Sequence, residues 1–202
     1  WGAGTWGEST WGTGGTGTIK LRLWSQSNFG EDLIFGPKGG TVYYWDATNS
    51  HTTRAIALTG TDIPTKQNLV LVSDINRFAF CFGANTISTS VQAGSLRLSR
   101  GSEIIAAKQT RQAITVWTDT AVYSLQFLGG QAGWGAQLIG DNVSIVSPNA
   151  VCYAGGVSYW MGKDKFYLSD GNIKVLPCNL LRYVFGDFNL GQTDQIFAGS
   201  NE

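Results

Sequence analysis

Short runs of aromatic and β-branched residues, separated by turn residues, recur along the chain and predict β-hairpins. In the clearest example, Val157–Trp160 and Phe166–Ser169 suit a pleated sheet, and Met161–Lys165 between them reverses the chain. Ser169–Asn172 then turns the chain toward Ile173–Leu176, because Gly and Asn tolerate positive φ angles. This stretch predicts a three-stranded antiparallel meander.

Three earlier stretches repeat the same hairpin pattern. The paired runs are Leu33–Phe35 with Val42–Trp45, Leu69–Val72 with Phe78–Phe82, and Ile114–Trp117 with Val122–Phe127. The turn centres Lys38, Ile75, Asp119 and Lys163 are separated by 37, 44 and 44 residues. Repeats of roughly 40 to 45 residues with about four strands each are typical of β-propeller blades.

Further short strands are expected between the hairpins, at Leu96–Leu98, Ile104–Ala107 and Val143–Val146, where they would complete such blades. The predicted fold class is therefore all-β, with β-propeller-like repeats of short antiparallel hairpins. A β-sandwich is the alternative, because it also gives short strands at regular spacing.

One short helix is expected near residues 179–186, and only one. It would begin at Pro177-Cys178-Asn179 and place apolar residues on a single face, namely Leu180, Leu181, Val184, Phe185 and Phe188.

The N-terminal residues differ in character from the rest of the chain. Residues 1–17 form a Gly/Trp-rich lead-in in which Trp1, Trp6 and Trp11 recur every five residues. The lead-in either grips a partner subunit or a sugar, or packs its rings on the domain's own outer surface. From Thr18 to Trp24 apolar and polar residues alternate, which predicts a strand and the start of a β-propeller-like domain at residues 18–202. We expect the chain to be part of a longer polypeptide.

The charge and composition of the chain limit the kinds of partner that it can bind. Charged residues make up 14% of the chain, against roughly 25% in average soluble domains. Eight Trp, seven Tyr and ten Phe residues then leave much neutral surface, as in a subunit covered by neighbours or in a Gly-rich β protein. The net charge of zero gives no basic field to collect nucleic acid. No segment approaches the roughly 18 apolar residues of a membrane span.

Candidate chemistry is sparse, so we expect no enzyme, no cofactor and no metal. His51 lies in a loop of hydroxyl and amide residues, where a solvated side chain is expected. A depolymerase would need two nearby carboxylates, but the adjacent Glu31 and Asp32 would point to opposite faces of a strand. Aspartates in turns usually bond their own backbone; those in predicted turns are Asp119, Asp141, Asp164 and Asp170. The three cysteines, at wide spacings, are expected to be reduced core residues, namely Cys81, Cys152 and Cys178.

Four stretches of the chain carry a resemblance to known proteins, namely Trp24–Asp46, Ala106–Phe127, Gly133–Val151 and Gly156–Phe185. Together they resemble structural proteins of tailed bacteriophages, in particular the tail nozzle and tail-stabilisation proteins of short-tailed phages. The resemblance implies a β-propeller-containing subunit that repeats as a ring at the distal end of the tail. DNA would pass through this ring as cargo, and other tail proteins and fibres would attach beside it. The implied location is the virion, after synthesis in the host cytoplasm.

The expected function is thus that of a non-enzymatic structural component of a phage tail, of the nozzle or hub type, acting as a homo-oligomer. The candidate interface residues are the aromatics Trp1, Trp6, Trp11, Trp24, Trp45 and Trp134. The alternative is a carbohydrate-binding receptor-recognition protein with tryptophan rings as stacking platforms. Its candidate rings are Trp1, Trp6, Trp11, Trp45, Trp117, Trp134 and Trp160.

Overall fold

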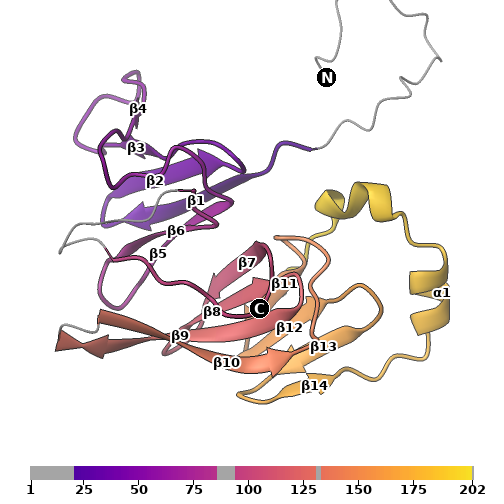
Figure 1. Cartoon of the computed structure of the whole chain (residues 1–202). Coiled ribbons are helices and arrows are strands. Elements are labelled where there is room, and N and C mark those ends of the chain that lie inside the picture. Colours follow the sequence, from indigo (N-terminus) through magenta and orange to yellow (C-terminus); the bar gives the residue numbers. More distant parts are fainter. Residues whose placement is uncertain (1–20, 86–93, 131–132, 202) are drawn as a thin grey trace, which may run out of the picture.

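The computed structural model describes residues 21–85, 94–130 and 133–201, and these are mostly β-strand (Figure 1). The strands are β1 (Trp24–Phe29), β2 (Asp32–Pro37), β3 (Tyr43–Trp45), β4 (Ile56–Ala57), β5 (Leu69–Val72), β6 (Ala79–Phe82), β7 (Ile104–Gln109), β8 (Ile114–Thr118), β9 (Ala121–Gly129), β10 (Gly133–Asp141), β11 (Val151–Ala154), β12 (Val157–Met161), β13 (Phe166–Ser169) and β14 (Ile173–Val175). Two short helical segments follow them, α1 (Leu181–Gly186) and the 3-10 helix η2 (Leu190–Gln195).

The strands form four antiparallel sheets, which follow one another along the chain. The first sheet contains β1 to β4, the second β5 and β6, the third β7 to β10, and the fourth β11 to β14. Within each sheet every strand pairs with the next one in sequence, so each four-stranded sheet is a meander. The four predicted hairpins are confirmed as β2 with β3, β5 with β6, β8 with β9, and β12 with β13.

Each pair of neighbouring sheets encloses one cluster of buried side chains. Ile34 and Val42 of the first sheet region meet Val70 and Val72 of β5. A second cluster joins the second and third sheets and includes Leu69, Phe82, Ile114, Val116 and Leu125. A third joins the third and fourth sheets and includes Trp117, Val122, Val151, Trp160 and Tyr167. The hydrophobic core is therefore divided into layers between successive sheets.

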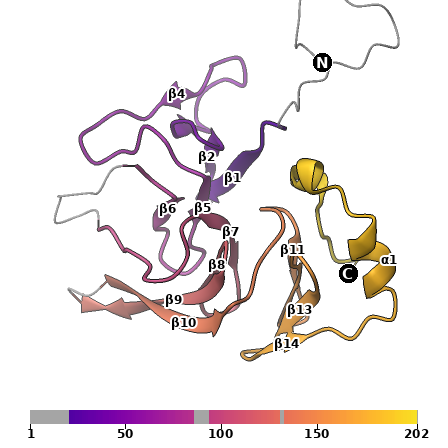
Figure 2. The ribbon, with the colours of Figure 1, turned by 45° about the vertical axis from the view of Figure 1, so that its right-hand side comes forward.

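The first strands of the four sheets lie next to one another. β1 contacts β5, β5 contacts β7, and β7 contacts β11. Figure 2 shows these four strands near the middle of the molecule, with the later strands of each sheet running outward. The sheets thus fan out from a shared inner edge, which we call the hub.

Burial on both faces explains the sequences of the inner strands. Strand β5 reads LVLV, because Val70 and Val72 face the first sheet while Leu69 and Leu71 face the third. All five residues of β8 are buried for the same reason. A strand covered on both faces reads as a continuous apolar run instead of an alternating one.

Two predicted strands are wrong, because Leu96–Leu98 and Val143–Val146 lie in no sheet. Of the predicted strand Thr18–Trp24, residues 18–20 lie outside the described residues, and Leu21–Leu23 precede β1, which starts at Trp24. Val143, Ile145 and Val146 are buried in the cluster between the third and fourth sheets, so their apolar run reflects packing and not strand pairing. The expected strand at Ile104–Ala107 is confirmed as part of β7.

The predicted helix is confirmed at Leu181–Gly186, inside the expected range 179–186. It is short and contains no buried residue, although the ring of Phe185 lies 5.3 Å from Phe166 and 6.2 Å from Phe188. The expectation of a single helix is wrong, because η2 follows it. The Asn189 side chain starts η2 by accepting a hydrogen bond from the Gly191 N–H at 3.0 Å.

Candidate functional site

One face of the first sheet carries a row of aromatic side chains that no neighbouring sheet covers. In the β1–β2–β3 register Gln26 lies opposite Phe35, and Phe35 lies opposite Tyr43, so these side chains share a face with Trp24. Trp24 is 56% exposed, and none of the three core clusters includes Trp24, Phe35 or Tyr43. We call Arg22, Trp24, Phe35 and Tyr43 the aromatic row.

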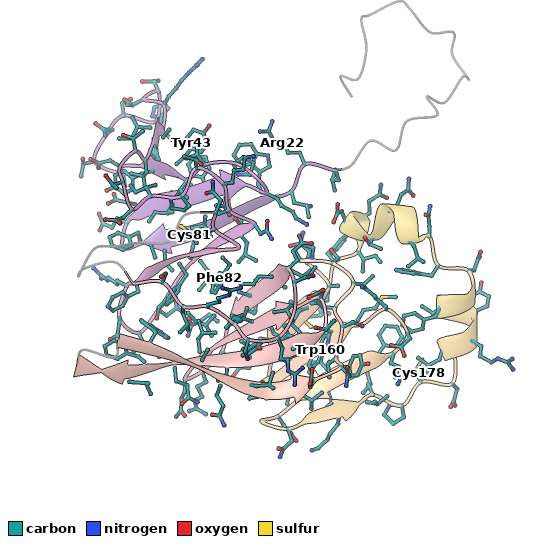
Figure 3. The ribbon with its side chains drawn as sticks, in the orientation of Figure 1. Arg22, Tyr43, Cys81, Phe82, Trp160 and Cys178 are labelled. Carbon is teal, nitrogen blue, oxygen red and sulfur yellow. The ribbon has the colours of Figure 1, made fainter. Side chains whose placement is uncertain are left out.

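The members of the aromatic row contact one another in sequence across the strands. The Arg22 guanidinium carbon lies 5.8 Å from the centre of the Trp24 ring. Ring centres are 6.2 Å apart for Trp24 and Phe35, and 5.6 Å apart for Phe35 and Tyr43, whose planes differ by only 19°. Figure 3 shows Arg22 and Tyr43 on the side of the first sheet that faces away from the other sheets. Ring faces are thus partly occupied by neighbours within the row.

The opposite face of the first sheet is fixed to the second sheet by serine side chains. Ser25 and Ser27 accept hydrogen bonds from the backbone N–H groups of Val70 and Val72 at 2.8 and 3.0 Å. These bonds occupy the edge of β5 that β6 leaves free, since β5 pairs with β6 on its other side. The two faces of β1 therefore have different roles, one internal and one free for a partner.

Two other predicted interface tryptophans have contacts within the chain. Trp45 lies on the face of the aromatic row, and its indole N–H donates to the Thr53 carbonyl at 3.0 Å. Trp134 of β10 is half-buried in an aromatic cluster, 4.9 Å from Phe80 and 5.6 Å from Phe127 between ring centres. This cluster joins the second and third sheets.

Two further candidate tryptophans are not exposed. Trp117 and Trp160 are buried and meet edge to face, with ring centres 5.6 Å apart. Neither can serve as a sugar platform, so that part of the carbohydrate hypothesis is wrong. Trp1, Trp6 and Trp11 lie outside the described residues.

A cavity of about 380 Å³ lies at the hub. Residues of β1, β5, β7 and β11 line it, together with Phe197 and Ala198 near the C-terminus. Ala198 is held there by a hydrogen bond from its N–H to the Asn149 carbonyl at 2.7 Å. The lining includes Lys38 and Lys108, and Lys38 lies 3.5 Å from Glu103, so the cavity is at most weakly basic.

The expected bonding of turn aspartates to their own backbone is confirmed for Asp170 and wrong for Asp119, which bonds a distant segment instead. Asp119 accepts hydrogen bonds at 2.7 Å from both the N–H and the hydroxyl of Ser102, and these bonds hold the pKa of Asp119 below its usual value. The ammonium of Lys174, 2.7 Å from Asp170, and the N–H of Asn172 likewise lower the pKa of Asp170.

Asp32 is bonded at the base of the first hairpin. It accepts a hydrogen bond from the Tyr44 hydroxyl and another at 3.0 Å from the N–H of Ala47. The Tyr44 bond, followed by the Ala47 bond, lowers the pKa of Asp32, and the same carboxylate raises the pKa of Tyr44 to about 12. Asp32 therefore has a structural role in joining β2 to β3.

The cysteines and other candidate ligands are dispersed. Cys81, Cys152 and Cys178 are free thiols, and burial raises the pKa of Cys81 to about 11. Within residues 21–85, 94–130 and 133–201, no three His, Cys, Asp or Glu side chains lie close enough together to hold a metal ion. His51 is exposed in its loop. None of the helices described is long and apolar enough to cross a membrane.

Sequence reasoning found part of the aromatic row and missed the rest. It identified Trp24 but not Phe35, Tyr43 or Arg22, although Phe35 and Tyr43 face each other in a hairpin that was predicted. The register of that hairpin could have shown that these two rings are neighbours.

No protein-family model matches the chain, and no curated protein matches it.

Proposed function

We propose that the protein is a non-enzymatic structural subunit of a bacteriophage tail, of the nozzle or hub type. In this proposal it assembles into a homo-oligomeric ring in the virion, through which DNA passes and to which other tail proteins and fibres attach. Its four sheets act as successive blades of a β-propeller-like array, and its function is rigid assembly through protein contacts.

The observation that carries the proposal is the contact series of β1, β5, β7 and β11, the first strands of the four sheets. In a propeller, blades are four-stranded meanders placed around a central axis, and each blade buries its faces against its neighbours. The three core clusters between successive sheets fit this scheme. A sandwich has two facing sheets, whereas four successive sheets are described here.

The exposed apolar surface supports a role in assembly. Exposed apolar patches on a soluble protein usually mark a contact site, and the aromatic row places the exposed Trp24 beside the partly exposed Phe35 and Tyr43. With charged residues at 14% of the chain, burial of such a surface has a small desolvation cost.

The geometry of the aromatic row favours a protein partner over a sugar. A sugar ring stacks on a free aromatic face, but Phe35 stands between Trp24 and Tyr43, and Arg22 lies over Trp24. The parts left for a partner are mainly ring edges, which suit interdigitation with other side chains.

Native mass spectrometry and negative-stain electron microscopy of the purified chain test the assembly, and immunogold labelling tests its location. We expect a single closed oligomer seen as rings, and gold particles at the tail of virions whose genome encodes the chain. A stable monomer at all concentrations would refute the ring, and labelling of the capsid alone would refute the tail assignment. Binding to a glycan array that Trp24→Ala abolishes would support the carbohydrate-binding alternative instead.

A further inference from the structure

Two surfaces, one on the first sheet and one after the last, carry large apolar side chains that stay exposed. One is the aromatic row on the first sheet. The other is the segment after the fourth sheet, Pro177–Asn201, which we call the C-terminal arm. The arm carries large exposed apolar side chains at Leu180, Tyr183, Leu190 and Phe197.

Contacts within the chain hold the C-terminal arm at several points but leave many of its apolar side chains exposed. Phe188 and Ile196 pack against the cluster between the third and fourth sheets, and Ala198 bonds Asn149. Tyr183 is 79% exposed and Phe197 is 81% exposed, and neither α1 nor η2 contains a buried residue. A helix of six residues without a side-chain cap, such as α1, is marginal in water unless tertiary contacts support it. The ring contact of Phe185 with Phe166 anchors α1, and the large side chains that stay exposed are available to a partner.

The charges of the two surfaces are complementary. Arg22 in the aromatic row forms no ion pair with any described carboxylate. In the arm, Asp187 and Asp194 likewise have no cationic partner within the part of the chain that the structure describes, and Arg182 is the arm's only cation. The arm is therefore net acidic where the row is basic, which favours a contact between the two.

We propose that the C-terminal arm of one copy packs on the aromatic row of a second copy. The two surfaces belong to the last and first parts of the sheet series, so the contact is heterologous and repeats from copy to copy. A heterologous contact that closes after a fixed number of copies generates a ring. The inference rests on the proposed function, since it identifies the two surfaces that would build the ring.

Charge reversal with rescue tests this contact in the full chain. The variants are Arg22→Glu, the double variant Asp187→Lys with Asp194→Lys, and the combination of all three. We expect each single-surface variant to weaken association by about tenfold or more, and the combination to recover most of it. Leu128→Ser is the matched control, because Leu128 is exposed but lies on neither surface. Circular dichroism checks that each variant is folded.

A mixing experiment distinguishes heterologous from isologous contacts. Copies with a defective row (Trp24→Ala with Tyr43→Ala) are mixed with copies with a defective arm (Leu190→Ser with Phe197→Ser). The proposal predicts that each variant alone is monomeric and that the mixture forms dimers, because one intact row then meets one intact arm. If the row variant alone abolishes assembly while the arm variant does not, the rows contact each other and the inference is wrong.

The remaining outcomes separate this inference from the proposed function. Rings that persist in every row and arm variant overturn the inference but leave the ring itself standing. A wild-type chain that stays monomeric overturns both. Loss of rescue in the triple variant, with both single-surface variants defective, shows that the two surfaces bind different partners and also refutes the contact.

Discussion

The hydroxyl of Ser25 accepts a hydrogen bond at 2.8 Å from the backbone N–H of Val70, so a side chain of the first sheet occupies a pairing position at the edge of the second. Ser27 does the same for Val72 at 3.0 Å. The two sheets are therefore joined at the hub by direct hydrogen bonds as well as by apolar packing. Val70 and Val72 are buried, and water cannot easily replace these acceptors.

Removing either hydroxyl should destabilise the fold. We expect Ser25→Ala and Ser27→Ala each to lower the free energy of unfolding by about 1–3 kcal/mol, because a buried N–H loses its partner. Urea denaturation measures the loss, and hydrogen exchange should show faster exchange at the Val70 and Val72 amides. Gln26→Ala is the control, since Gln26 is exposed on the other face of the same strand. Equal effects in all three variants would contradict the assigned role.

Substitution of Trp117 should destabilise the fold much more than substitution of Trp24. Trp117 is fully buried between the third and fourth sheets, and Trp117→Ala should cost about 3–5 kcal/mol of unfolding free energy. Trp24→Ala removes only an exposed ring with one aromatic neighbour, and should cost no more than about 1.5 kcal/mol. Urea denaturation of both variants measures this. A Trp24→Ala loss as large as that of Trp117→Ala would mean that the aromatic row has a structural role and not an interface role.

The hairpins could be predicted because they depend only on the residues of a short stretch of sequence. Short aromatic and β-branched runs on both sides of Lys38, Ile75, Asp119 and Lys163 specify strands and turns without reference to the rest of the chain. Strand β1 (Trp24–Phe29) could not be predicted, because its sequence WSQSNF is mostly polar: its serines bond a neighbouring strand, and the residues of its other face are exposed. The polar pattern is explained only by tertiary structure.

The candidate site was predicted only in part, because it too depends on tertiary structure. Tryptophan composition pointed to Trp24, but exposure depends on which sheets cover which face. Trp117 and Trp160 have the same chemistry as Trp24 and are buried. The buried run Val143–Val146 resembled a strand because apolar packing and strand pairing leave similar patterns over four residues.

Gly101 should be intolerant of any side chain. Its φ angle is +91°, and a Cβ there would overlap Thr118, which is buried. Gly101→Ala should cost about 1–3 kcal/mol from backbone strain, with the overlap adding to it. Gly39→Ala is the control for strain alone, since Gly39 has a φ of +76° but no neighbour within 4 Å of the added Cβ. Thermal melting should rank Gly101→Ala below Gly39→Ala, and the reverse order would show that Thr118 can move away.

The Asp32–Tyr44 hydrogen bond should make stability depend on pH at both ends of the range. Because the pKa of Asp32 is lowered in the folded protein, ionised Asp32 stabilises the fold at pH values above the ordinary carboxyl pKa of about 3.9. This stabilisation is lost as the pH falls through the pKa that Asp32 has in the folded protein. Because the pKa of Tyr44 is raised to about 12, the protonated hydroxyl stabilises the fold at pH values below the ordinary tyrosine pKa of about 10. This stabilisation is lost as the pH rises through about 12.

Tyr44→Phe removes both contributions at once, because each depends on the same bond. The difference in unfolding free energy between wild type and Tyr44→Phe should be largest between about pH 5 and pH 10 and shrink outside that range. Urea midpoints measured from acid to alkaline pH give this difference. In Asp32→Asn the loss of the carboxylate should return the Tyr44 pKa toward its ordinary value, which the absorbance of the tyrosinate reports. A constant difference for Tyr44→Phe at all pH values would mean that the lost hydroxyl acts without the carboxylate.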